Sequence, residues 1–577
     1  MLPQLLEARL QEATLAVLPD ADVSTVLLRP CADPQYGDYQ TNALMALAKS
    51  RKLNPRQLAT EVLQRLEVQT WCDRVEIAGA GFLNFRLRTT ALAEAIRQAR
   101  ETRRLFFWPA SQPRTVVIDF SSPNVAKPMH VGHIRSTILG DCLARTLRFL
   151  GHHVITDNHI GDWGTAFGKL LVGWKKHLQA DALKARPMDE LERVYRTVNA
   201  ACEQDPAVLE SSRQELVKLQ QGDPENLGIW REMIALSKDQ FDRVYARLDV
   251  QFDHSLGESF YNPELKAVVQ QLRERGIASE SDGATVVFFE GVPELKGQPA
   301  IVQKSDGAAN YTTTDLATLD YRVRTWRPDE IIYVTDGRQQ LHFQQLFSIF
   351  RRWHPHAKTK LSHVWFGSIL GQDGKPFKTR SGEIIRLLDL LDEAEERADQ
   401  LAATKNPELD ESQRREIARV VGLGALKYSD LLPNRQTDYV FDWDKMLALN
   451  GHTAPYLQYA YTRIRSIFRK GEARDQTAVP SEAAAPIVLA VAEEISLAKH
   501  LLNFGVVLQA VAEDYRPNYL CNYLYDLSGR FARFYETCPV LRAEPAERCT
   551  RLALCELTGQ VLKQGLGVLG IETTELM

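Results

Sequence analysis

Two histidines separated by two residues stand where an apolar, strand-like pattern gives way to a helical one. They are His130 and His133, with Gly132 between them, and the change of period places them at the amino end of the helix. Backbone N–H groups at that position bind phosphate, and histidine side chains donate hydrogen bonds to oxygens on which negative charge develops. Gly132 lets a nucleotide approach the backbone closely. The arrangement predicts adenylyl transfer; the structural alternative is two histidines that only complete a helix start.

The residues around this motif predict a strand, a helix and a second strand. The strands are expected at residues 115–120 and 153–156, and the helix at about residues 131–150. Leucines recur at helical spacing along that helix, and Gly151 occupies the position of a left-handed C-cap. This order predicts a βαβ unit, with the histidines between its first strand and its helix.

Further strands and helices follow a charged segment of helical period, at about residues 176–250, that looks like an insertion. Their alternation predicts a doubly wound α/β sheet. The strands are expected at residues 284–289, 300–303, 330–335 and 361–366, and the helices near residues 314–324 and 339–353.

The chain as a whole is expected to be a multidomain α/β protein, because 577 residues and 65.3 kDa exceed what one hydrophobic core supports. Residues 1–105 predict a small α+β domain. Residues 113–384 predict a Rossmann-type, doubly wound catalytic domain that carries the helical insertion. Residues 385–577 show helical patterns with few strand candidates and predict an all-α bundle.

Composition excludes several classes of protein. The eight cysteines form no C-x-x-C pair, which argues against a zinc ribbon or a disulfide framework and favours a reducing, cytoplasmic setting. No secretory signal and no run of about 18 apolar residues are found, so no membrane association is expected. The formal net charge of −4 is uninformative about RNA, because local basic patches can bind RNA on an acidic protein.

Motifs along almost the whole chain resemble those of the arginyl-tRNA synthetases, a family of class I aminoacyl-tRNA synthetases. The resemblance implies an amino-terminal domain that contacts the tRNA elbow, a Rossmann catalytic domain and an α-helical anticodon-binding domain. The matching segments are SSPNVAKPMHVGHIRSTI at 121–138, GDWG at 161–164, GESFY at 257–261, YTTTD at 311–315, GQDGKPFKTRSG at 371–382 and GHTAPYLQY at 451–459.

One motif departs from the class I pattern. The loop that usually reads K-M-S-K-S is FKTRS at residues 377–381. Lys378 and Arg380 still supply cations for a triphosphate, although neither takes the place of the usual second lysine. The resemblance implies that Lys127, just before the histidine motif, compensates, and that tRNA is needed before arginine is activated. Solvated surface charge is the alternative for Lys127 and Lys378.

Recognition of arginine requires carboxylates, because a guanidinium presents a planar fork of donors. Asp315 and Glu258 are the candidates, and Tyr311 lies four residues before Asp315, so a ring and an acid can share one face. The resemblance implies that Asn124 and Gln339 add polar contacts to the substrate. The alternatives are a helix cap for Asp315 and an Asx-turn for Asn124.

Candidate RNA contacts lie in two places. Aromatic and basic side chains within one helical stretch are candidates for stacking on unpaired anticodon bases, with packing in the core as the equal alternative. These are Tyr456, Tyr459, Tyr461 and Arg463. The resemblance places Phe82, Asn84 and Phe85 near the D-loop of the tRNA.

The resemblance implies a two-step reaction. The carboxylate of arginine attacks the α-phosphate of ATP, with Mg²⁺ as counterion, and the arginyl group then passes to the terminal ribose of tRNA. No tightly bound cofactor and no protein-held metal are expected, and the chain is expected to act as a monomer. The alternatives are a class I synthetase of another specificity, a small adenylyltransferase, and an inactive synthetase-like protein that only binds tRNA.

Overall fold

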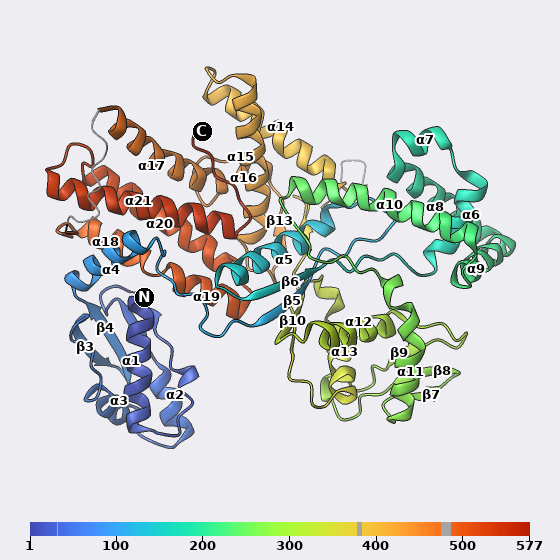
Figure 1. The fold of residues 1–577 in the computed structure, drawn as a ribbon, viewed down its shortest axis with the longest axis horizontal. Coiled ribbons are helices and arrows are strands. Elements are labelled where there is room, and N and C mark those ends of the chain that lie inside the picture. The colour runs from blue at the N-terminus through green and yellow to red at the C-terminus, as the bar shows by residue number, and fades with distance from the viewer. Residues whose placement is uncertain (32, 378–383, 475–485) are drawn as a thin grey trace. The chain divides into compact units, whose positions relative to one another are not determined.

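The chain folds into two compact units in a computed structural model (Figure 1). The structure describes residues 1–31, 33–377, 384–474 and 486–577. The first unit comprises residues 1–111, 402–424 and 447–577, and the second comprises residues 112–401 and 425–446.

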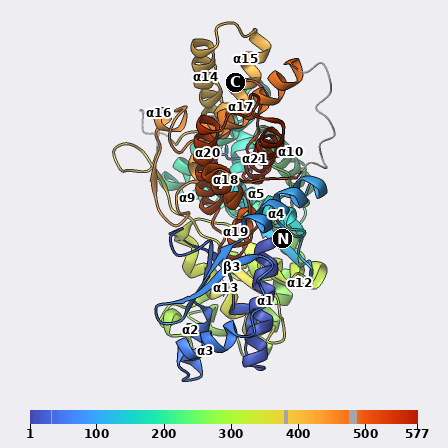
Figure 2. The same ribbon diagram turned by 90° about the vertical axis from the view of Figure 1, so that its left-hand side faces the viewer.

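The amino-terminal part of the first unit is an α+β domain, as predicted (Figure 2). Its four strands form an antiparallel sheet in the order β1-β2-β4-β3. Helices α2 and α3 pack on this sheet, and α1 packs on α3. The elements are α1 (Leu2–Val17), η1 (Val23–Thr25), β1 (Arg29–Pro30), β2 (Tyr39–Thr41), α2 (Ala43–Ser50), α3 (Pro55–Leu63), β3 (Cys72–Ala78), β4 (Phe82–Leu87) and α4 (Thr89–Thr102).

The carboxyl-terminal part of the first unit is the predicted helical bundle. Helix α20 contacts α17, α18, α19 and α21, so it lies at the centre of the packing. Residues 492–514 are long and apolar enough to cross a membrane, but 56% of their apolar 18-residue window is buried, as in the core helices of many folded domains. The bundle elements are α17 (Ala454–Arg474), α18 (Ala492–Leu501), α19 (Phe504–Asp514), α20 (Asn518–Thr537) and α21 (Pro545–Val568).

A four-stranded parallel sheet forms the centre of the second unit and confirms the doubly wound prediction. Its strands are β5 (Thr115–Asp119), β6 (His153–Asp157), β10 (Glu330–Tyr333) and β11 (Lys360–His363). The order is β11-β10-β5-β6, so the chain winds from β5 to one side and later returns to the other. The carboxyl end of β5 is therefore the switch point at which such sheets bind ligands. Helix α5 (Val131–Phe149) follows this strand (Figure 1).

Two predicted strands lie in a different sheet from the one expected. Strands β8 (Ala284–Val287) and β9 (Ala300–Gln303) pair with β7 (Ser279–Ser281) in a separate antiparallel sheet. The reason is a two-residue turn between β7 and β8, in which Asp282 and Gly283 have φ values of 50° and 76°. Two positive φ values in succession are what a tight hairpin requires, and a hairpin forces antiparallel pairing.

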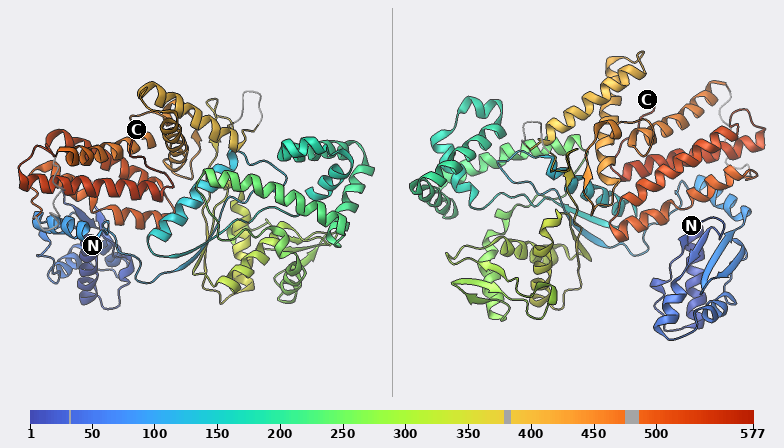
Figure 3. Two further views of the ribbon diagram at one scale, coloured as in Figure 1. Left: turned by 45° about the horizontal axis from the view of Figure 1, so that its top comes forward. Right: turned by 180° about the vertical axis from the view of Figure 1, so that it is seen from behind.

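The charged segment forms the predicted helical insertion. Helix α6 packs against α8, α9 and α10, and helices of the insertion, in turquoise to green, lie together in both views of Figure 3. Asp205 and Asp223 cap two of the helices, each followed by a proline in the first turn. The helices are α6 (Ala166–His177), α7 (Ala180–Ala185), α8 (Pro187–Gln204), α9 (Pro206–Gln220) and α10 (Pro224–Arg247).

The second unit continues past residue 385, the predicted start of the carboxyl-terminal domain. The backbone N–H of Leu387 donates to the carbonyl of Met129, and Asp430 forms a buried ion pair of 2.9 Å with Arg135 of α5. The boundary itself stays a prediction. The remaining elements are η2 (Glu258–Glu264), α11 (Leu265–Glu274), η3 (Pro293–Leu295), α12 (Tyr311–Trp326), η4 (Gly337–Gln339), α13 (Gln340–Trp353), β12 (Ile369–Leu370), α14 (Leu387–Lys405), α15 (Glu411–Leu431), β13 (Tyr439–Val440) and α16 (Trp443–Met446).

Candidate active site

The two motif histidines cap helix α5 reciprocally. The Nδ1 atom of His130 accepts a hydrogen bond of 3.1 Å from the N–H of Gly132, and the N–H of His130 donates one of 3.1 Å to Nδ1 of His133. Both Nδ1 atoms are therefore acceptors, and in a neutral imidazole the proton then sits on Nε2. Each ring keeps one N–H donor for a ligand at the amino end of the helix, where the dipole favours anions.

Burial keeps both rings neutral. Burial, with a smaller contribution from the neighbouring His130, lowers the pKa of His133 to about 3. Burial and the charge of Lys127 lower the pKa of His130. The ring centroids lie 4.1 Å apart, and a Cβ at position 132 would lie 2.8 Å from Cε1 of His130. Any larger residue than Gly132 would therefore displace the His130 ring.

The loop before α5 places two further predicted residues. Asn124 is exposed and lies beside Gly161, where a Cβ would come within 2.2 Å of the Asn124 side-chain oxygen. Lys127 is exposed, and its Nζ lies 5.4 Å from the centroid of the Tyr195 ring, a cation–π contact with the insertion. Because Gly161 has no Cβ, the Asn124 side chain can occupy this position.

Asp315 lies in the second turn of α12, not at its cap. The helix begins at Tyr311, and the side chain of Asn310 caps it by accepting the N–H of Tyr311 at 3.0 Å. The capping alternative for Asp315 is therefore wrong. Oδ2 of Asp315 lies 2.6 Å from Nε2 of His342, and the Tyr311 ring meets the His342 ring edge-on at 4.9 Å.

Glu258 approaches Asp315 from a separate segment. It begins the short helix η2, and its N–H donates to the carbonyl of Ile160 at 3.1 Å. Burial raises the pKa of its carboxyl to about 7; His159 opposes this shift, and the charges of Asp315 and Asp162 add to it. Ile160 directly follows His159, whose Nε2 lies 4.0 Å from Oδ1 of Asp315, so both predicted guanidinium-binding carboxylates lie next to this segment.

Hydrogen bonds to Asp162 stabilise the turn that carries Glu258. The N–H and the hydroxyl of Ser259 donate to the two carboxylate oxygens of Asp162 at 2.8 Å and 2.7 Å. A Cβ at Gly257 would lie 2.3 Å from that carboxylate. Gln339, the remaining predicted arginine contact, is exposed at the end of η4, three residues before His342.

A buried ion triad ties α12 to the central sheet. Arg322 lies two turns after Asp315, and its guanidinium lies 2.7 Å from Asp119 and 2.8 Å from Asp157, the last residues of β5 and β6. Burial opposes the charge of Arg322, but the two carboxylates raise its pKa. Removing Arg322 would leave two buried carboxylates without their partner cation, which costs about 3 to 5 kcal/mol.

Sequence reasoning missed this triad and the two histidines beside Asp315. His159 lies two residues before the matched GDWG segment, and His342 follows Gln339 by three residues. Their nearness to matched segments was the only available signal. No signal in the sequence indicated Arg322, because its partner Asp157 is 165 residues away in the chain.

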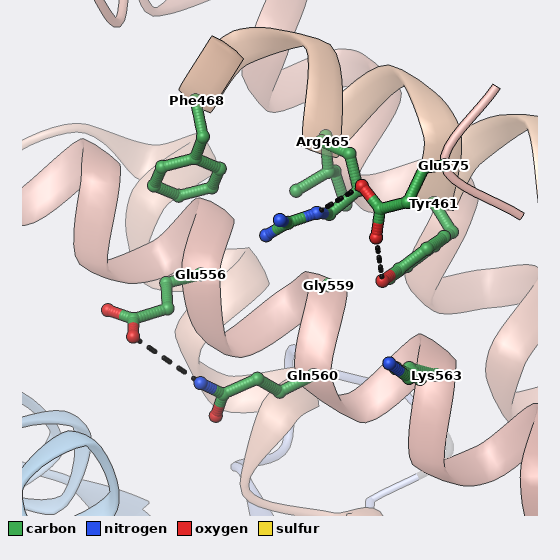
Figure 4. Close-up of a pocket in the computed structure, with 9 residues that line it drawn as sticks. Tyr461, Arg465, Phe468, Glu556, Gly559, Gln560, Lys563 and Glu575 are labelled. Carbon is green, nitrogen blue, oxygen red and sulfur yellow. Dashed lines mark hydrogen bonds and ion pairs between the residues drawn. The ribbon is translucent and has the colours of Figure 1, made fainter. Parts of the chain in front are cut away.

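The RNA-contact candidates differ in exposure. Tyr459 is 46% exposed, Tyr456 is half-buried, and the exposed Arg463 lies over the ring of Tyr535 at 5.0 Å. Tyr461 is buried and donates to Glu575 at 3.2 Å, where it lines a cavity of about 330 Å³ between α17 and α21 (Figure 4). Core packing therefore accounts for Tyr461.

The amino-terminal candidates lie on one strand. Phe82, Asn84 and Phe85 all belong to β4. Phe82 is half-buried, Asn84 is 7% exposed, and Phe85 is completely buried in the sheet core. Their contacts with tRNA stay predictions.

Lys378 and Arg380 lie outside the described residues. On one side of this segment, the Phe377 ring stacks on Phe441 at 4.3 Å. On the other side, the N–H of Val131 donates to the carbonyl of Ile385 at 2.9 Å. The described flank after the loop is thus bonded directly to the first residue of the motif helix. Across the described ranges, no group of three or more His, Cys, Asp or Glu side chains is placed to hold a metal ion.

Models of three protein families match the chain. They are "tRNA synthetases class I (R), catalytic domain" over residues 96–443, "DALR anticodon binding domain" over residues 457–577, and "Arginyl tRNA synthetase N terminal domain" over residues 2–87. Among curated relatives, the arginine–tRNA ligase of Citrobacter koseri is 48% identical over 557 residues and 95% of each chain. That of Salmonella dublin is 46% identical over 581 residues and 99% of each chain.

Solved structures show the same likeness over the whole length. Arginyl-tRNA synthetase from Plasmodium falciparum superposes with a TM-score of 0.80 and 28% identity, covering 100% of this chain and 99% of the other. The enzyme from Thermus thermophilus gives a TM-score of 0.82 with 25% identity and complete coverage of both chains.

Proposed function

The chain belongs to the class I arginyl-tRNA synthetases, and from that premise we propose how its residues perform the reaction. The protein is an ATP-dependent ligase that joins arginine to tRNA for protein synthesis. The amino end of α5 would bind the phosphates, and the Glu258–Asp315 pair would bind the arginine side chain. The observation that supports the proposal is that both carboxylates adjoin one segment: Asp315 lies 4.0 Å from Nε2 of His159, and the N–H of Glu258 donates to the carbonyl of Ile160.

In the first step, the neutral rings of His130 and His133 donate hydrogen bonds from their Nε2–H groups to the phosphate oxygens of ATP. Gly132 leaves room for the nucleotide, and Lys127 adds positive charge three residues before the motif. Mg²⁺ bound to ATP as its counterion would neutralise charge on the phosphates. Because these groups are fixed before the reaction, they stabilise the charge that develops during attack without reorganising.

In the same step, Asp315 and Glu258 pair with the guanidinium of arginine. Tyr311 places its ring beside the side chain, and Asn124 and Gln339 contribute polar contacts. The arginine carboxylate then attacks the α-phosphate and expels pyrophosphate. In the second step a hydroxyl of the terminal ribose of tRNA attacks the arginyl carbonyl, an ester bond forms, and AMP leaves. We place the protein in the cytoplasm and propose that it acts as a monomer.

Replacement of the Asp315 charge tests the arginine site. Asp315→Asn keeps the side chain's shape but removes the charge that pairs with guanidinium. We expect arginine binding to weaken by at least about 1.5 to 3 kcal/mol, the range for hydrogen bonds to charged groups. Titration calorimetry with arginine measures this change, and thermal unfolding should barely shift.

Asp320→Asn is the matched control, since Asp320 lies on the same helix and contacts His354 instead of the arginine site. It should leave arginine affinity unchanged. If Asp315→Asn retains full arginine affinity, the assignment of Asp315 fails.

Arginine affinity is also expected to depend on pH through Glu258. Its pKa of about 7 means that the carboxyl is mostly protonated at pH 6 and mostly ionised at pH 8. Guanidinium pairs with the ionised form, so affinity should rise by about tenfold between these values, because one pKa unit corresponds to a tenfold change in the ionised fraction below the pKa. Glu258→Gln should bind arginine more weakly and remove this dependence. An equal pH dependence in that variant would assign the titration to another group.

Charging of bulk tRNA tests the activity as a whole. The purified protein should attach radiolabelled arginine to tRNA only when ATP is present. It should attach none of the other amino acids. Charging with a different amino acid would establish another class I specificity. A protein that binds tRNA but charges nothing would be an inactive relative.

A further inference from the structure

The two carboxylate oxygens of Asp315 have different surroundings. Oδ2 lies 2.6 Å from Nε2 of His342, within hydrogen-bond distance. Oδ1 lies 4.0 Å from Nε2 of His159 and makes no such bond to it. The Asp315 side chain is 28% exposed, whereas each histidine side chain is 12% exposed. One oxygen is thus hydrogen-bonded within the protein, while the carboxylate as a whole is still partly exposed to solvent.

The partners of His342 define which of its nitrogens carries the proton. An ionised carboxylate only accepts, so Nε2 of His342 is the donor in its bond to Asp315. Nδ1 of His342 is buried and has no hydrogen-bond partner among the described residues. A proton there would be a buried, unpaired donor, so the geometry fits a neutral ring with its proton on Nε2. Edge contacts with Tyr311 at 4.9 Å and Phe343 at 5.3 Å hold the ring.

His159 has the opposite arrangement. Its Nδ1 lies 3.0 Å from the carbonyl oxygen of Leu256, which can only accept, so Nδ1 carries the proton. Nε2 of His159 faces Oδ1 of Asp315 at 4.0 Å, which is beyond hydrogen-bond distance. His159 therefore leaves Oδ1 available to a ligand with N–H donors.

We propose that His342 is a positioning residue for the specificity of the arginine site. By holding Oδ2, it fixes the Asp315 carboxylate so that Oδ1, with Nε2 of His159 beside it, is presented to the N–H groups of the guanidinium. A planar cation with several N–H donors can satisfy Oδ1. Citrulline, which has a carbonyl oxygen in place of one guanidinium nitrogen, loses a donor and brings an acceptor to the same place, so the site rejects it. This inference rests on the proposed role of Asp315.

Two substitutions of His342 separate positioning from packing. His342→Leu fills a similar volume but cannot donate, whereas His342→Gln keeps an N–H donor at about the place of Nε2. We expect His342→Leu to weaken arginine binding by at least about tenfold, as for the loss of a hydrogen bond to a charged group. The Gln variant should recover to within about threefold of the native affinity. The KM for ATP should stay unchanged, and the preference for arginine over citrulline in kcat/KM should fall in the Leu variant.

His354→Leu is the matched control. Nε2 of His354 lies 3.1 Å from Oδ1 of Asp320, so this pair also joins a histidine at α13 to an aspartate of α12 but lies away from Asp315. It should leave arginine affinity and citrulline discrimination unchanged. If His354→Leu weakens arginine binding as much as His342→Leu does, the effect comes from the contact between the two helices and the inference is overturned.

A double variant distinguishes this inference from the proposed function. If His342 acts through the Asp315 charge, His342→Leu should cost little more once Asp315→Asn is present, so the two losses should not add. Fully additive losses overturn the inference. If Asp315→Asn weakens arginine binding but His342→Leu does not, the inference fails and the arginine site stands. If Asp315→Asn has no effect, the proposed function of Asp315 itself has failed.

Discussion

His133→Ala is expected to lower kcat for arginyl-adenylate formation by about two orders of magnitude, with little change in the KM for arginine. The substitution removes the Nε2 donor that the neutral ring offers to the phosphates. A preorganised donor that acts only in the transition state contributes about 2.7 to 4 kcal/mol. Pre-steady-state formation of the adenylate, measured in the presence of tRNA, gives the rate directly.

The same substitution also removes a helix cap, since His133 accepts the N–H of His130. His133→Asn is the control, because the side-chain oxygen of asparagine can accept that N–H while nothing replaces the distant Nε2. We expect the Asn variant to keep the native melting temperature and to be as slow as the Ala variant. A loss of less than threefold in either variant would make His133 a structural residue.

The elements whose pattern is local could be predicted from the sequence. The strand, loop and helix around His130 were found because the hydrophobic period changes there, and the same change placed the histidines at a helix start. The reciprocal hydrogen bonds between the two histidines were not foreseen. A capping box usually pairs a serine or threonine with a glutamate, so two histidines gave no such signal.

Two short-range signals in the sequence indicate a different arrangement from the one expected. Asp282 and Gly283 form a dipeptide typical of a tight hairpin, which places β8 in an antiparallel pair and not in the parallel sheet. Asn310 is a preferred N-cap residue directly before Tyr311. It could have shown that the helix starts too early for Asp315 to be its cap.

The remaining site residues could not be predicted, because their partners depend on strand order. Asp119 and Asp157 meet Arg322 only because β5 and β6 are neighbours and α12 packs against the sheet, a relation between segments more than 150 residues apart. His342 meets Asp315 through the packing of α12 on α13. Hydrophobic periodicity does not determine either pairing.

Exchange of pyrophosphate into ATP, dependent on arginine, is expected to be nearly absent in the RNA-free protein and to appear when cognate tRNA is added. The resemblance implies this requirement, and the FKTRS segment lacks the second lysine that usually stabilises the leaving pyrophosphate. If the free protein rarely occupies its reactive state, tRNA that binds this state more tightly shifts the population toward it.

The test must use the full chain. Removal of residues 385–577 would also remove Asp430, the buried partner of Arg135 on the motif helix, so a loss of exchange would only report damage to α5. Tyr459→Ala and Arg463→Ala are better variants, because both side chains are exposed on α17. Each should raise the tRNA concentration needed for half-maximal exchange and leave exchange at saturating tRNA unchanged. Robust exchange by nuclease-treated protein would show instead that tRNA is a substrate of the second step only. The phosphate-binding histidines and the Glu258–Asp315 pair would then suffice for activation.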